Sequence, residues 1–220
     1  MNKIFCIGHF KTGTTSYSMA MRMLGFRDIH FPLKYAERLQ ETGDVYWDDR
    51  EWDSMSNINE VEYDRCDRVY PDSKFVLTTR VVDSWLVSIQ KHMATKWPPR
   101  LKKLLDWRSE VVFGVPCELE AFDEEHFRKR YIEHYEGVLD YFRGREEQLL
   151  VLFLESNMKM ESLATFLGKG IPYPRMNVSP GPVAGMECPG IPTLVAGGLK
   201  RTVDYDEKTV FLQFEEPVKW

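Results

Sequence analysis

The first 25 residues constrain the fold most, because a strand pattern gives way to a helix pattern across one glycine-bearing loop. Ile4 to Gly8 is a short, nearly all-apolar run, which is typical of a parallel strand buried on both faces. From Ser16 to Leu24 the apolar residues suit a helix, and Gly25 stands where a left-handed cap ends one. Strand, loop and helix in this order predict the opening of a nucleotide-binding βαβ unit.

The same succession returns twice further along the chain. Residues 74–79 predict a second buried strand, and residues 82–93 predict the helix that follows it, with Arg80 at the junction. Residues 149–154 predict a third buried strand, followed by a helix that ends at Gly168. These repeated strand and helix units predict an α/β fold of three layers, α/β/α, around a central parallel sheet.

Other segments carry weaker signals. A long helix is predicted to begin after Asp123, a plausible N-cap, and to end before Gly144. Residues 27–69 show a short helix near residues 34–40 and otherwise no regular pattern, so we expect variable, substrate-facing structure there.

The end of the chain is also irregular. Residues 170–192 hold six of the twelve prolines, which predicts a long surface loop. Residues 209–214 favour a terminal strand or hairpin.

The bulk properties indicate one domain over residues 1–220, with a core in residues 1–168 and an extension in residues 169–220. The net charge of −5 gives no support to a nucleic-acid partner, which usually requires a basic surplus on one face.

The four cysteines are not spaced for a metal or a redox pair. No signal peptide and no apolar run of membrane-spanning length is evident, so we expect a cytoplasmic protein without stable membrane insertion.

The loop from Gly8 to Ser16 is predicted to bind an anion. Backbone N–H groups and the positive end of a helix converge where such a loop joins a strand to a helix. The loop is not a Walker A motif, because that motif places its lysine directly after the second glycine. Here Lys11 precedes Gly13, and Thr14 follows it. A lysine two residues before this glycine reaches a different atom of the bound group.

The segment Lys-Thr-Gly-Thr-Thr-Ser, residues 11–16, resembles the phosphosulfate loop of the sulfotransferases. This resemblance implies a P-loop-like fold and the donor 3′-phosphoadenosine 5′-phosphosulfate, whose product is adenosine 3′,5′-bisphosphate. It further implies that Lys11 stabilises the leaving phosphate and that no metal is required. The residues that would form the phosphate cradle by the same resemblance are Thr12, Gly13, Thr14, Thr15 and Ser16.

A second part of the resemblance concerns the 3′-phosphate, which distinguishes this donor from ATP. Family members place an arginine at a strand end and a serine eight residues later, and here Arg80 and Ser88 have that spacing. Arginine suits a phosphate because its planar group donates hydrogen bonds in pairs. Further matches to a bacterial-type branch extend the resemblance over about residues 3–177; they are residues 70–74, 84–85, 131–135 and 172–177. Lys200 and Arg201 are further candidates for a late basic contact with the 3′-phosphate.

Transfer of a sulfuryl group to a hydroxyl or amine also needs a base that removes the proton of this acceptor group. The residue that serves as this base is less well defined. In the family this base is a histidine or a carboxylate from the segment before the arginine strand. Residues 52–57 resemble a stretch that often carries two aspartates, of which Asp53 remains and Asn57 takes the second place. Asparagine cannot act as a base, so we favour Asp53, with His30 and Glu37 as rivals. Asp53 could equally be a helix cap or a solvated carboxylate.

Together these features predict a sulfotransferase that modifies a hydroxyl or amine of a small molecule or glycan. Two alternatives stay open. A kinase of nucleotides or metabolites would need Gly-Lys-[Ser/Thr] in the loop and a strand-end aspartate for magnesium, neither of which is evident. The other alternative is a relative that binds the nucleotide without catalysing transfer. Asn57 keeps this alternative open, because an asparagine stands where relatives often carry a second aspartate.

Overall fold

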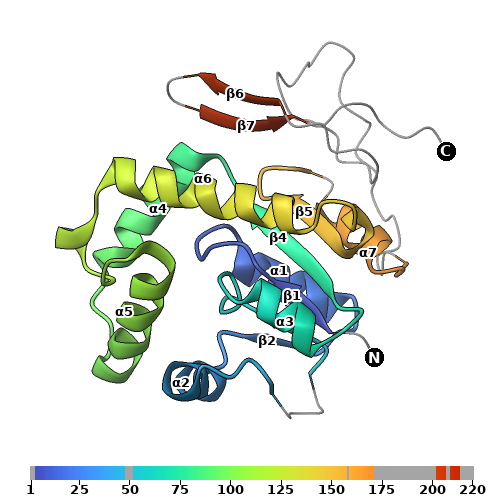
Figure 1. Cartoon of the computed structure of the whole chain (residues 1–220), viewed down its shortest axis with the longest axis horizontal. Coiled ribbons are helices and arrows are strands. Elements are labelled where there is room, and N and C mark those ends of the chain that lie inside the picture. Colours follow the sequence, from blue (N-terminus) through green and yellow to red (C-terminus); the bar gives the residue numbers. More distant parts are fainter. Residues whose placement is uncertain (1–2, 48–51, 158, 171–201, 207–208, 214–220) are drawn as a thin grey trace, which may run out of the picture.

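The computed structural model describes residues 3–47, 52–157 and 159–170, together with the backbone of residues 202–206 and 209–213. Within these ranges a five-stranded parallel sheet, in the order β2-β3-β1-β4-β5, forms the centre of the molecule (Figure 1). Its strands are β1 (Ile4–Cys6), β2 (Asp28–His30), β3 (Ser54–Ser56), β4 (Lys74–Thr79) and β5 (Leu149–Phe153).

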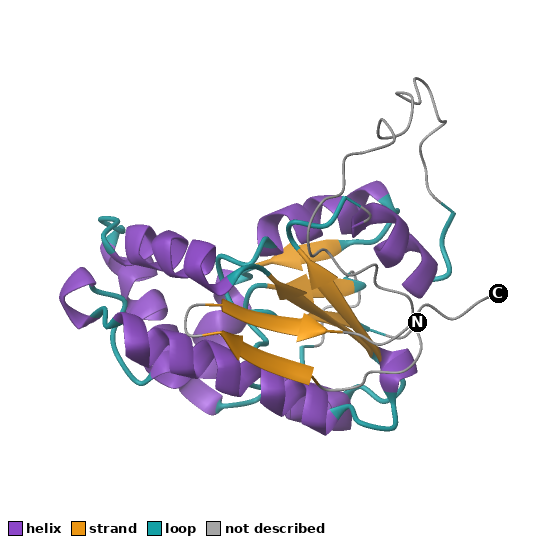
Figure 2. Ribbon diagram, turned by 90° about the horizontal axis from the view of Figure 1, so that it is seen from above, coloured by secondary structure: helices purple, strands orange, loops and turns teal. Residues whose placement is uncertain are grey.

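Helices cover both faces of the sheet, as Figure 2 shows, so the predicted three-layer α/β/α arrangement is confirmed. The seven α-helices of the described residues are α1 (Thr14–Met23), α2 (Leu33–Thr42), α3 (Tyr63–Val69), α4 (Val82–Met93), α5 (Pro99–Phe113), α6 (Glu124–Tyr141) and α7 (Lys159–Phe166). Helices α1 and α7 pack on one face, and α2 to α6 contribute to the core on the other. Two short 3₁₀ turns lie at Leu119–Ala121 and Glu146–Gln148.

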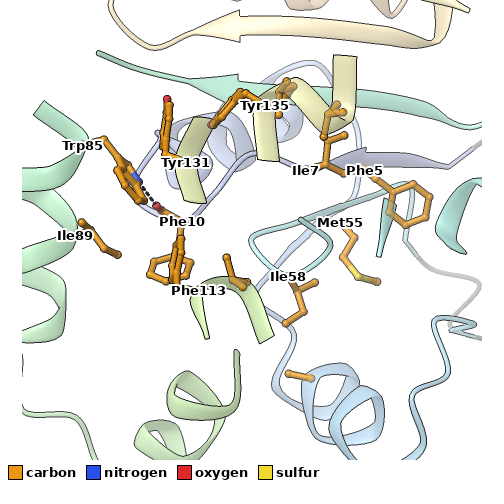
Figure 3. Close-up of a cluster of buried hydrophobic side chains, with 14 of the residues drawn as sticks. Phe5, Ile7, Phe10, Met55, Ile58, Trp85, Ile89, Phe113, Tyr131 and Tyr135 are labelled. Carbon is orange, nitrogen blue, oxygen red and sulfur yellow. Dashed lines mark hydrogen bonds between the residues drawn. The ribbon is translucent and has the colours of Figure 1, made fainter. Parts of the chain in front are cut away.

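The two faces divide the core into two clusters, because successive side chains of a strand point to opposite sides. In β1, Phe5 belongs to the larger cluster, whereas Ile4 and Cys6 belong to the smaller one beneath α1 and α7. Figure 3 shows part of the larger cluster, in which Trp85 of α4 lies beside Phe10. The indole Nε1 donates to the Phe10 carbonyl at 3.0 Å, so the loop after β1 is tied to α4.

The strongest periodic segments of the sequence fold as predicted. Strand β4 and helix α4 have the predicted bounds, and β5 ends one residue before the prediction. Helix α6 begins directly after Asp123, whose carboxylate accepts from the His126 amide at 2.7 Å. The predicted short helix at residues 34–40 is α2. Strands β2 and β3 and helices α3 and α5 were not anticipated.

The C-terminal part is described only for its backbone. Strands β6 (Thr202–Asp206) and β7 (Thr209–Gln213) pair antiparallel, which agrees with the predicted terminal hairpin. Residues 171–201 lie outside the described residues, and they include most of the predicted proline-rich loop as well as Lys200 and Arg201. Phe214, the last residue of the predicted strand, also lies outside them.

Candidate functional site

The loop between β1 and α1 follows the carboxyl end of a central strand, the usual position of a ligand site in a parallel sheet. Lys11 and Gly13 have positive φ angles of 72° and 94°, so two left-handed residues shape the turn into α1. Loops of this kind direct consecutive N–H groups into a concave anion site. Gly8 is required by space, since a Cβ there would meet the Thr78 carbonyl oxygen at 2.2 Å.

Neighbouring elements hold this loop in place. The Thr12 hydroxyl donates to the His9 carbonyl at 2.5 Å and lies 2.8 Å from the Thr78 hydroxyl. Thr12 is buried, and its backbone N–H also donates to the His9 carbonyl, at 3.3 Å. Its polar groups therefore stabilise the loop itself. Of the residues predicted to bind the donor, Thr12 is the one that does not line the polar cavity described next.

A cavity of about 370 Å³ opens beside the loop. It is lined by residues of the loop and α1, of the segments after β3, β4 and β5, and of helices α4 and α5. The residues predicted to bind the donor that line it are Lys11, Gly13, Thr14, Thr15, Ser16, Arg80 and Ser88. The lining residues that were not predicted as ligands are Phe10, Asn57, His92, Trp97, Leu105, Arg108 and Leu154.

Arg80 is oriented by contacts on three sides. Its Nε donates to the Ser84 hydroxyl at 2.9 Å, and its Nη1 donates to the Lys11 carbonyl at 3.2 Å. Glu155, after β5, lies 3.8 Å from its Nε. Ser84 and Ser88 are one turn apart and therefore share a face of α4. The structure thus brings the predicted arginine, the predicted serine and the loop to one place.

The cavity is cationic, although the chain as a whole is acidic. Lys11, Arg80 and Arg108 line it, and no carboxylate is among its lining residues within the described chain. Arg108 is 3% exposed, and its Nε donates to Glu60 Oε1 at 2.6 Å. Its guanidinium lies 4.6 Å from the centre of the Phe10 ring. Glu60 offsets the charge of Arg108, so an anion that enters the cavity meets positive charge mainly from Lys11 and Arg80.

Asp53, the favoured base, does not reach this cavity. It precedes β3, and because the strands are parallel it lies at the sheet edge opposite the loop. Its Oδ2 accepts from the Arg27 backbone N–H at 2.8 Å and from Arg27 Nε at 3.2 Å. Hydrogen bonds from Arg27 lower the pKa of Asp53. A carboxylate held in this way at the far edge suits a structural role.

Glu37 does not reach the cavity either. It lies on α2, where Arg100 Nε and Nη2 donate to its two oxygens at 2.7 Å and 2.9 Å. The residue that takes the expected place of an acid at the loop edge is Asn57, which follows β3. Its Oδ1 accepts from the Thr14 hydroxyl at 3.3 Å and from Arg108 Nη2 at 3.4 Å.

His30 contacts the loop but is not among the residues that line the cavity, whereas His92 lines it. His30 ends β2, with its Nε2 3.3 Å from the Thr15 hydroxyl and its Nδ1 2.9 Å from the Ser56 hydroxyl. Partial burial lowers the pKa of His30, and Asp28 opposes this shift. His92 lines the cavity from α4, and burial, Lys11 and Arg108 lower its pKa to about 4. Both imidazoles are therefore expected to be neutral near pH 7.

Sequence reasoning missed Arg108, and it did not place Asn57 or His92 at the cavity. A signal existed for His92, which lies four residues after Ser88 and so on the same helix face. None existed for Arg108, because α5 lies in a segment without a recognisable motif and its place depends on packing with α2 and α6.

A second cavity, of about 170 Å³, lies on the other side of the loop among α1, β5 and α7. It shares Gly13, Ser16 and Leu154 with the first cavity, and its other walls include Ala20 and Met160. The two cavities therefore meet at the start of α1.

No group of three or more His, Cys, Asp or Glu side chains in the described part of the chain is arranged to hold a metal ion. None of the helices described there is long and apolar enough to cross a membrane.

Comparison with known proteins gives two matches. The sequence matches the model of a family described as "Sulfotransferase domain" over residues 3–180. It is also similar to "Ava biosynthesis cluster protein M" of Aspergillus versicolor, with 28% identity over 144 residues. That match covers 56% of this chain and 50% of the fungal protein, so the chain corresponds to about half of its relative.

Proposed function

The chain belongs to the sulfotransferase family, and from this premise we propose that it transfers a sulfuryl group from 3′-phosphoadenosine 5′-phosphosulfate to a hydroxyl or amine of a small molecule or glycan. The observation that carries the proposal is the common cavity of Lys11, Arg80 and Ser88. These residues come from the first loop, the end of β4 and the middle of α4. Their shared position supports a ligand with two separate anionic groups.

In the proposed complex the loop amides and the hydroxyls of Thr14, Thr15 and Ser16 hold the 5′-phosphate. Arg80 and Ser88 hold the 3′-phosphate, because a guanidinium and a neighbouring hydroxyl donate to phosphate oxygens. The smaller apolar cavity between α1 and α7 is proposed to receive the nucleobase. Lys200 and Arg201 remain candidates for a further contact outside the described residues.

The proposed reaction is an in-line displacement at sulfur. The acceptor oxygen or nitrogen forms a bond to sulfur while the bond from sulfur to the bridging phosphate oxygen breaks. The electron pair of that bond stays on the phosphate, and the proton of the acceptor passes to a base. Lys11 stabilises the growing negative charge on the phosphate, since a cation already in place needs no reorganisation.

We propose His30 as the base, in place of Asp53 and Glu37. It is the one of the three sequence candidates that contacts the loop, through Thr15. Once the Thr15 hydroxyl donates to the 5′-phosphate instead, His30 Nε2 is free to accept a proton. His92 is the competing base, but a pKa of about 4 makes it a weak proton acceptor.

The proposed acceptor is a small molecule with a planar or apolar part. Phe10, His92 and Trp97 form one wall of the cavity, with the His92 and Trp97 ring centres 5.0 Å apart. Aromatic side chains bind planar apolar groups through their faces and edges. The similarity to a protein named for a biosynthesis cluster also supports a small molecule.

The test is a calorimetric comparison of ligands with the purified chain. Adenosine 3′,5′-bisphosphate should bind without magnesium and more tightly than ADP with or without magnesium. Arg80→Gln should weaken this binding about 10- to 100-fold, the effect of losing charge-assisted hydrogen bonds. Arg100→Gln is the matched control, because Arg100 pairs with Glu37 away from the cavity.

Two results would favour other functions. A preference for ADP with magnesium would indicate a kinase. Tight binding of the bisphosphate without transfer of labelled sulfate to a panel of phenols, alcohols, amines and sugars would indicate a non-catalytic relative. Asn57, at the position where relatives often carry an aspartate, is the observation that favours this second outcome.

A further inference from the structure

A row of polar side chains lies on one face of the sheet, at the edge formed by β2 and β3. The two strands pair with Asp28 opposite Ser54 and His30 opposite Ser56. Alternate residues of a strand share a face, so these four side chains point to the same side, toward α1. Asp28 is 6% exposed and both serines are 0% exposed. A buried carboxylate in such a place requires hydrogen-bond donors.

The serines supply these donors. Ser54 Oγ donates to Asp28 Oδ1 at 2.6 Å, and Ser56 Oγ donates to Asp28 Oδ2 at 3.0 Å. Ser56 also lies 2.9 Å from His30 Nδ1, and His30 Nε2 lies 3.3 Å from the Thr15 hydroxyl. A continuous path of hydrogen bonds therefore leads from the buried carboxylate to the loop.

Which group donates in each hydrogen bond between Asp28, Ser56 and His30 follows from the number of protons that each side chain carries. A carboxylate only accepts, and a serine hydroxyl has a single proton. Because Ser56 gives its proton to Asp28, its oxygen accepts from His30 Nδ1. In a neutral imidazole the other nitrogen, Nε2, then carries the lone pair. That lone pair faces Thr15 at the wall of the cavity.

We propose that Asp28 and Ser56 are positioning residues that fix the tautomer of His30 and keep its Nε2 ready to accept the acceptor's proton. The inference rests on the proposed function. When Nε2 takes the proton, Nδ1 keeps its hydrogen bond to Ser56, and Asp28 balances the new positive charge through that hydroxyl. No other proton needs to move.

The other charged groups that affect His30 act against its protonation. Arg108 on α5 and Arg22 on α1 both lower the pKa of His30, as does its partial burial. Asp28 on β2 is the one that raises it. Removing the Asp28 and Ser56 contacts should therefore lower the pKa of His30 further and weaken it as a base.

The first experiment reads the tautomer directly and needs no turnover. Nitrogen-15 spectra of the wild-type chain, assigned with His30→Gln, should show the proton on Nδ1 of His30 at pH 8. In Ser56→Ala the proton should move wholly or partly to Nε2. Ser54→Ala is the matched control, because Ser54 contacts Asp28 and Tyr17 but not His30; it should keep the wild-type tautomer.

The second experiment uses sulfuryl transfer. Ser56→Ala and Asp28→Asn should lower kcat about 10-fold or more, within the range of general base catalysis, and move the acid limb of the pH profile to lower pH. Ser56→Thr should restore both. A purely structural role would instead lower kcat equally in Ser54→Ala and Ser56→Ala and leave the pH profile in place.

The two experiments separate the two proposals. A proton on Nε2 of His30 in the wild-type chain would overturn the positioning role, whether or not sulfate is transferred. The expected tautomer in a chain that transfers no sulfate would leave the hydrogen-bond path established and overturn its catalytic use. Normal transfer by His30→Gln with loss in His92→Gln would assign the base to His92 and overturn the proposal.

Discussion

At the scale of single residues, Lys11 combines a strained backbone with a place in the cavity. Its φ of 72° is a conformation that glycine adopts far more easily, and side chains there raise the energy by about 1–3 kcal/mol. Such strain persists where the surrounding structure holds it, and here Arg80 Nη1 donates to the Lys11 carbonyl at 3.2 Å. A lysine at this position is therefore consistent with use of its ammonium group.

Replacing Lys11 with methionine should remove transition-state stabilisation while leaving the loop in place. If Lys11 acts on the leaving phosphate, Lys11→Met should lower kcat about 100- to 1000-fold, the usual effect of losing one charge-stabilising group. The affinity for adenosine 3′,5′-bisphosphate should change much less. Lys91→Met, at an exposed position of α4, is the control. Equal kcat values for Lys11→Met and wild type would exclude this role.

Site residues could be predicted from sequence where they belong to a short local motif. Lys11, Arg80 and Ser88 were predicted from their resemblance to sulfotransferase motifs, and all three line the cavity. Asp53 and Asn57 show the limit of this reasoning. They flank one short strand, Asp53 before β3 and Asn57 after it, and only the structure shows that the asparagine is the one on the side of the loop.

At the scale of elements, β2 and β3 were missed because their sequences are typical of turns. Each has three residues, and they contain Asp28, Ser54 and Ser56. Such residues normally favour turns because their side chains bond to the nearby backbone. Here they satisfy one another across two strands. Strand β4 was predictable because its burial depends on its own apolar residues.

Substitution by alanine should change the stability of the fold in opposite directions at Gly8 and at Gly137. Gly8→Ala should destabilise the fold by about 1–3 kcal/mol, because its Cβ would lie 2.2 Å from the Thr78 carbonyl and the backbone must shift. Gly137→Ala should stabilise it by about 0.5–1 kcal/mol, since Gly137 lies inside α6 and the nearest atom to its Cβ, the Tyr63 hydroxyl, is 3.6 Å away. Urea unfolding measures both. If Gly8→Ala were as stable as the wild-type chain, the loop after β1 could shift away from Thr78 of β4 at little cost.

At the scale of the whole molecule, the stability of the fold should depend on buried histidines that are kept neutral, three of which have the largest pKa shifts. Burial lowers the pKa of His134 and of His92 to about 4 each, and lowers the pKa of His9 well below its usual value. The unfolded chain titrates near 6.5. Between these values the unfolded state binds more protons than the folded state, so stability should fall as the pH drops below 6.5.

One carboxyl group acts in the opposite direction. Burial and the neighbouring Glu60 raise the pKa of Glu62 to about 7, so the folded state binds this proton first as the pH falls. Glu62 should thus stabilise the fold by about 2 kcal/mol between pH 7 and pH 5, whereas His134 and His92 should each destabilise it by about 2 kcal/mol. With the contribution of His9 added, the effect of the histidines exceeds that of the Glu62 carboxyl group. The free energy of unfolding should therefore decrease as the pH falls from 7 to 5.

Urea unfolding of the full chain at pH 7, 6 and 5 tests this balance. His134→Gln, whose amide can still donate to the Ile7 carbonyl, should make the decrease smaller. Glu62→Gln should make it larger, because the opposing group is lost. A chain whose stability is unchanged from pH 7 to pH 5, or two variants that shift the slope in the same direction, would show that other groups control the acid response.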